Sequence, residues 1–161
     1  MITENKKGAK CPMVQFTISN KKLSIEEIEQ FEIRNRIKLT SKYKRFLLQF
    51  NGGYPRESLF DISDKHGKSV LNVFNGIGDM YDNLEKVIDL YEFRLAKGFV
   101  PIANDLGGNV ICLGTKEPHY EKIYFWDHEQ EPEDADDMSN MYFLANDIDE
   151  FLSHLYEDPD E

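Results

Sequence analysis

Residues 99–126, FVPIANDLGGNVICLGTKEPHYEKIYFW, decide the fold of this chain. The stretch contains three runs of about five residues that are largely apolar, Phe99 to Ala103, Asn109 to Leu113 and Lys122 to Trp126. A polar segment with two glycines joins the first run to the second, and residues 114–121 join the second to the third. Short runs rich in β-branched and aromatic residues, separated by turn residues, are typical of antiparallel strands. We therefore predict three consecutive strands here.

Two further strands are predicted upstream of this stretch. The apolar runs Leu59 to Ile62 and Val70 to Phe74 are separated by a polar segment that contains Gly67. A short polar connection with a glycine between two such runs favours a β-hairpin.

Four segments have the periodicity of amphipathic helices. Ser24 and Glu27 form the Ser-x-x-Glu capping box, which predicts a helix from Ile25 to Asn35. The other three helices are expected at Leu39 to Phe50 with Thr40 as the cap, from Leu84 until Gly98, and at Asp147 to Tyr156 with Asn146 as the cap. The predicted fold class is α+β, with a single mostly antiparallel twisted sheet flanked by about four helices.

The length and organisation of the chain favour one domain. A chain of 161 residues lies within the usual size of a single domain, and the sequence contains no internal repeat and no proline-rich linker. We expect residues 1–23 to be a loose lead-in with a short strand at Val14 to Ile18, and Met13 is an alternative candidate for the start of translation. Residues 24–156 form the expected domain, and residues 157–161 an acidic C-terminal tail.

The sequence predicts a cytoplasmic protein. Its longest apolar runs are far shorter than the roughly 18 residues that suggest a membrane span, and no apolar stretch follows the N-terminal lysines as in a signal peptide. Cys11 and Cys112, the two cysteines, have neither Cys-x-x-Cys spacing nor the pattern of a disulfide framework.

Charge is distributed unevenly along the chain. The net charge is −11, and residues 123–161 contain 14 Asp and Glu but no Lys or Arg. Such a segment repels nucleic-acid phosphates and anionic lipid, so we expect neither partner. It attracts basic proteins and accelerates their encounter. The alternative interpretation is that the acid serves only solubility.

Several of these stretches, in this order, resemble the SUKH superfamily, which is named after the fungal cell-wall synthesis regulator Smi-one/Knr-four. The resemblance covers about Ser24 to Leu155. Its pieces are the Ile25 to Phe31 helix, the Leu39 to Phe50 helix ending in Asn51-Gly52-Gly53, the run Phe99 to Asp105 with Gly107-Gly108-Asn109, Ile123 to Glu129, and Ala145-Asn146 leading into Phe151 and Leu152. Thr40 stands where the family often has a proline.

The resemblance implies a helix-flanked sheet domain without catalytic residues and without a cofactor. Bacterial members are typically immunity proteins that neutralise polymorphic toxins, often nucleases, and fungal members act as regulatory scaffolds. We therefore expect a non-catalytic immunity protein that binds a cognate, basic toxin domain. A regulatory or scaffold module without a toxin partner is the alternative, and the oligomeric state stays open.

The expected binding surface is the acidic tract that follows the last of the three strands. It comprises Trp126, Asp127, His128, Glu129, Glu131, Glu133, Asp134, Asp136 and Asp137. The carboxylates would take the place of phosphates in a basic cleft. Trp126 is either an aromatic anchor at the edge of this surface or a core residue, and the core is the preferred interpretation.

Three patterns in the sequence superficially indicate other chemistry. The Asp127-His128-Glu129 cluster has the groups of a proton carrier or metal ligand, but no second histidine lies at a ligand spacing. The acids at 134, 136 and 137 lack the third ligand and the glycine of a calcium loop, since Met138 stands there. Gly107-Gly108-Asn109 is better explained as a turn than as a phosphate cradle. We predict no catalytic residue and no metal ligand.

Overall fold

The computed structural model describes residues 14–18 and 20–159 and is built on a six-stranded antiparallel sheet. The strands lie in sequence order, so each pairs with the one before and after it. They are β3 (Leu59–Ser63), β4 (Gly67–Phe74), β5 (Phe99–Asp105), β6 (Val110–Gly114), β7 (Ile123–Trp126) and β8 (Met141–Ala145). A small second sheet pairs β1 (Phe16–Ile18) with β2 (Tyr54–Pro55). The α+β class and the antiparallel sheet are confirmed.

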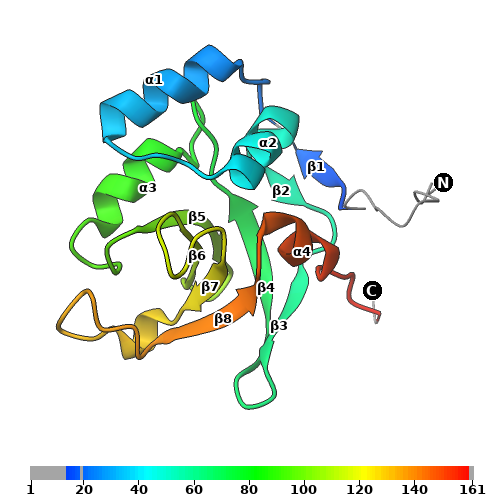
Figure 1. The fold of residues 1–161 in the computed structure, drawn as a ribbon. Helices are drawn as coiled ribbons and strands as arrows, with labels where there is room; N and C mark the ends of the chain where they lie inside the picture. The colour runs from blue at the N-terminus through cyan, green and yellow to red at the C-terminus, as the bar shows by residue number, and fades with distance from the viewer. Residues whose placement is uncertain (1–13, 19, 160–161) are drawn as a thin grey trace.

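Four helices pack against the sheet, as the sequence predicts (Figure 1). They are α1 (Ile25–Asn35), α2 (Ser41–Phe50), α3 (Leu84–Tyr91) and α4 (Ile148–Ser153). All four contribute side chains to one large core, which includes Phe31 of α1, Phe46 of α2, Leu84 of α3 and Phe151 of α4. The predicted capping box of α1 is present, since Ser24 and Glu27 each accept the other's backbone amide hydrogen.

The central strand β6 is buried on both of its faces. Ile111 and Leu113 point into the large core, whereas Val110 and Cys112 belong to a second, smaller core. The second core also contains Trp126 from β7, Met141 from β8, and Leu95 and Ala96 from the connection between α3 and β5. No helix supplies a side chain to the buried set of this second core within the described residues, so connecting segments cover that face.

Two helices, α3 and α4, differ from the sequence prediction in where they begin or end. The third helix ends at Tyr91 rather than at Gly98, because Glu92 leaves the helical conformation, with ψ of 135°, and Phe93 after it is left-handed with φ of +70°. The last helix begins after Asp147, whose side chain accepts the amide hydrogen of Glu150, and not after Asn146. It ends at Ser153, so the predicted extension to Tyr156 is wrong as well.

Strand β8 and the small sheet are additions to the predicted architecture. The sequence MYFLA of β8 follows directly on the acidic stretch, and its alternation of buried and exposed residues is irregular. The strand at the N-terminal lead-in is shorter than predicted, and it packs on the domain because the ring of Phe16 stacks on Phe50 at 4.4 Å. Residues 1–13, which include Met13 and Cys11, and residues 160–161 of the predicted tail lie outside the described residues.

The start of α2 is stabilised by distant residues instead of by its predicted cap. Thr40 Oγ1 is buried and has no hydrogen-bond partner among the described residues. The amide of Lys42 donates to Glu121 Oε2 at 3.1 Å, and its ammonium group donates to Asp147 at 2.7 Å. Burial acts to raise the pKa of Asp147, but hydrogen bonds from Lys42 and from the amide of Glu150 outweigh it and lower that pKa. The N-termini of α2 and α4 are therefore tied together.

We predict that Thr40→Val raises the free energy of unfolding by about 1 kcal/mol, because it removes a buried hydroxyl that has no partner in the described part of the chain. In the matched control, Ser24→Ala should lower it by about 1 kcal/mol, since Ser24 caps α1. Urea unfolding monitored by circular dichroism measures both values. A loss of stability in Thr40→Val equal to that in Ser24→Ala would show that Thr40 is a functional cap after all.

Candidate functional site

The acidic loop, residues 127–140 between β7 and β8, is folded on itself by its own carboxylates. Asp127 accepts the amide hydrogen of Glu129 and so caps a short 3-10 helix, His128–Gln130. Asp134 accepts the amide hydrogen of Asp136 at 2.9 Å, and Asp137 accepts that of Ser139 at 2.8 Å. Hydrogen bonds from the amide and hydroxyl of Ser139 lower the pKa of Asp137. These acids define the loop's shape as well as its charge.

The acidic loop packs against the α3–β5 connection, residues 92–98. The guanidinium group of Arg94 donates to both carboxylate oxygens of Glu131, at 3.1 and 3.0 Å. The hydrogen bond to Glu131 also raises the pKa of Arg94. The amide of Lys97 donates to Asp136 at 2.9 Å, and its ammonium group lies 4.0 Å from the same carboxylate. Arg94 and Lys97 therefore hold a loop that itself contains no Lys or Arg.

Trp126 lies beneath this contact and is only 1% exposed. Its ring meets Tyr91 edge-on at 5.6 Å, and the guanidinium carbon of Arg94 lies 5.7 Å from the centre of the indole. The preferred interpretation of Trp126 as a core residue is confirmed. Because its side chain is covered, it supports Arg94 from below and does not form part of the exposed surface.

His128 lies over the β5–β6 turn. Its ring approaches Gly108, whose φ is +88°, and its amide donates to Asn109 Oδ1 at 3.0 Å. The turn itself is organised by the buried carboxylate of Asp105, which accepts the amide hydrogens of Gly107 at 3.0 Å and Asn109 at 2.7 Å. Because both amides already donate to Asp105, they are not free to bind a phosphate. This agrees with the interpretation of the segment as a turn.

The described part of the chain contains no cluster of three or more His, Cys, Asp or Glu side chains with the geometry to hold a metal ion. The thiol of Cys112 is fully buried, and this burial raises its pKa. None of the helices in the described ranges is both long enough and apolar enough to cross a bilayer.

Two acids of the loop, Glu129 and Glu133, are exposed, and their side chains have no hydrogen bond or ion pair with any described residue. The same is true of the side chains of Asp89 and Glu92, at the end of α3 and directly after it. Of the predicted acidic residues, Glu129 and Glu133 are the two whose side chains have no partner among the described residues. The two acids near the end of α3 enlarge the negative surface beyond the predicted tract.

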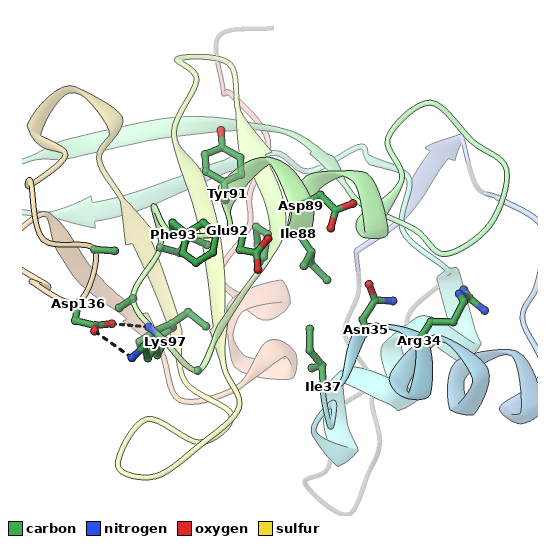
Figure 2. Close-up of a pocket in the computed structure, with 16 residues that line it drawn as sticks. Arg34, Asn35, Ile37, Ile88, Asp89, Tyr91, Glu92, Phe93, Lys97 and Asp136 are labelled. Atoms are coloured by element: carbon green, nitrogen blue, oxygen red, sulfur yellow. Dashed lines mark hydrogen bonds and ion pairs between the residues drawn. The ribbon is translucent and has the colours of Figure 1, made fainter.

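A groove of about 620 Å³ lies between the end of α1, α3, the 92–98 connection and the acidic loop (Figure 2). Ile37, just after α1, and Ile88 of α3 lie opposite each other across it. Leu95 and Pro101 add further apolar wall, and Asp136 brings the acidic loop to the other end. Sequence reasoning missed the groove because its walls come from segments far apart in the chain, and no local motif marks them.

The fold and the site define a small α+β domain with a groove on its surface. Residues 25–152 match the SUKH_6 family, described as SMI1-KNR4 cell-wall. The chain belongs to this family. It is also similar to the SPbeta prophage-derived uncharacterized protein YokK of Bacillus subtilis (strain 168), with 31% identity over 153 residues, covering 84% of this chain and 76% of that protein.

Arg94 is the residue that joins the acidic loop to the second core, and its replacement tests that role. We predict that Arg94→Ala lowers the free energy of unfolding by about 1 to 2 kcal/mol, because it loses a bidentate ion pair and the cation–π contacts with Tyr91 and Trp126. It should also shift the fluorescence of Trp126, the single tryptophan of the chain, to longer wavelength. Arg94→Lys should recover little, because an ammonium group provides neither the fork nor the planar stack.

Arg45→Ala is the matched control, because the Arg45–Asp149 ion pair is 62% and 41% exposed. Its effect should stay within about 0.5 kcal/mol. Equal effects of the Arg45 and Arg94 variants on stability, with no change in Trp126 emission, would contradict the assigned role of Arg94.

Proposed function

We propose that this protein is a non-catalytic immunity protein that binds and neutralises a cognate toxin domain through its acidic surface. Membership of the SMI1-KNR4 family supports the general class. The observation that carries the proposal is the acidic loop, part of a segment with 14 acids and no Lys or Arg, held in a defined shape on the 92–98 connection.

The mechanism is competition for a basic cleft. A toxin that acts on nucleic acid needs Lys and Arg to bind phosphates. Glu129 and Glu133 have no ion pair with a described residue, so their carboxylates do not have to break such a pair before they meet a basic cleft. Their field accelerates association, and salt screens it over about 8 to 10 Å at physiological ionic strength.

The origin of the relative fits this proposal. YokK is prophage-derived, and a gene that travels between hosts on a mobile element suits a product that protects the cell carrying it. A regulatory or scaffold module of the same fold would bind an endogenous partner instead. The partner encoded beside the gene therefore distinguishes the two functions.

The test measures binding to the toxin domain encoded next to this chain by surface plasmon resonance at low and high salt. Replacing both unpaired acids, Glu129→Gln with Glu133→Gln, should slow association roughly 3- to 10-fold at low salt, with a smaller effect in high salt and little change in the dissociation rate constant.

The matched control removes the same charge elsewhere, with Glu29→Gln and Glu117→Gln, two exposed acids without an ion pair among the described residues. An equal slowing in the control would show that only net charge matters. An unchanged rate in the Glu129 and Glu133 variant would exclude the acidic loop as the binding face, and a wild-type protein that fails to bind the toxin would exclude the immunity function.

A further inference from the structure

Phe93 combines two unfavourable features at one position. Its side chain is 86% exposed, and its backbone φ of +70° lies in the left-handed region. Bulky side chains rarely adopt this conformation, because the Cβ atom crowds the following carbonyl oxygen. Glycine or asparagine would relieve the strain, and a polar residue would remove an aromatic ring from water. Neither stability nor solubility accounts for a phenylalanine here.

The flanking residues hold Phe93 in this conformation. The amides of Arg94 and Leu95 both donate to the carbonyl oxygen of Tyr91, at 2.9 and 3.1 Å. Leu95 is buried in the second core, and Arg94 is fixed by Glu131 of the acidic loop. Because the chain is anchored on both sides, the ring of Phe93 is presented rigidly at the rim of the groove.

The groove beside Phe93 has an apolar interior and an excess of unpaired negative charge at its rim. Its two cations are accompanied by acids: Arg34 donates to both carboxylate oxygens of Glu85, and Lys97 lies against Asp136. Asp89 and Glu92, by contrast, are exposed and have no ion pair with a described residue. The complementary ligand is therefore apolar in the middle and cationic at its ends.

We propose that this groove, with Phe93 at its rim, is the docking centre for a segment of the partner protein that presents an apolar side chain flanked by Lys or Arg. The apolar side chain packs between Ile37 and Ile88, and the basic residues face Asp89 and Glu92. Phe93 provides the central aromatic contact of the interface. This proposal rests on the proposed function, since it takes the toxin domain as the partner. It identifies the groove as the part of this chain's surface where the binding energy is concentrated.

The first experiment measures the affinity of the toxin domain for Phe93→Asn, Phe93→Tyr and wild-type protein. Phe93→Asn should weaken binding by roughly 30-fold or more, mostly through faster dissociation, as expected for an aromatic hot spot. Its unfolding midpoint should stay equal or rise, because asparagine tolerates the left-handed conformation. Phe93→Tyr should retain affinity within roughly 3-fold, because the ring remains.

Leu106→Asn is the matched control, since Leu106 is also an exposed apolar residue, at 69%, but lies in the β5–β6 turn. If Phe93→Asn and Leu106→Asn both bind like the wild type while the Glu129 and Glu133 variant associates slowly, the docking centre is wrong and the immunity function stands. If wild-type protein does not bind the toxin at all, the immunity function is wrong and the toxin is not the occupant.

The second experiment tests the chemistry of the groove without the toxin. Benzamidine, an aromatic ring with a cationic group, and benzoate, its anionic counterpart, are titrated at millimolar concentration into isotope-labelled protein. Benzamidine should shift the amide resonances of Ile37, Ile88 and Lys97, and the double variant Asp89→Asn with Glu92→Gln should reduce these shifts. No shift with benzamidine, or shifts of equal size with benzoate, would overturn the assignment of an apolar and cationic ligand.

Discussion

The centre of the sheet is buried on both faces, and this constraint determines where the acidic loop is placed. Alternate residues of β6 belong to different cores, so a second cover is required opposite the helices. The 92–98 connection and the acidic loop provide it: Leu95 and Ala96 enter the second core, and Met138 of the loop packs against it. A loop that were merely a solvated tail would leave the Trp126 side of the sheet open to water. Its negative charge is therefore presented from a fixed platform.

Arg94 connects the 92–98 connection, which covers the second core, to the carboxylates of the acidic loop. Its guanidinium group lies over the rings of Tyr91 and Trp126 and pairs with Glu131, so apolar packing and electrostatics meet in one side chain. The acids of the loop consequently divide into two groups. Most of them fold or dock the loop through amide hydrogens and cations, whereas Glu129 and Glu133 have no such role within the described residues. The number of acidic residues therefore exceeds the number of carboxylates without a partner among the described residues.

Local signals in the sequence were sufficient for much of the fold. The capping box at Ser24 and the strands within residues 99–126 depend on neighbours in sequence, so they could be predicted. The hydrogen bond that caps α2 could not be predicted, because its acceptor is Glu121, 79 residues away from Lys42 in the sequence. The position of the acidic tract was evident, but its docking on Arg94 and the groove beside it depend on tertiary contacts. The left-handed backbone of Phe93 could not be predicted from the sequence either, since phenylalanine rarely occupies a left-handed position.

Charge and shape contribute differently to a complex of this kind. A negative field acts over the Debye length, draws in any basic protein, and weakens when salt is added, so on its own it discriminates poorly between partners. Apolar contact acts only at touching distance, but it depends on fit and slows dissociation. The structure places the two side by side: Asp89 and Glu92 line a groove whose walls include Ile37 and Ile88, and the acidic loop reaches this groove through Asp136. The acidic side chains accelerate the encounter with any basic protein. Selectivity among basic partners must therefore come from which side chains fit the groove.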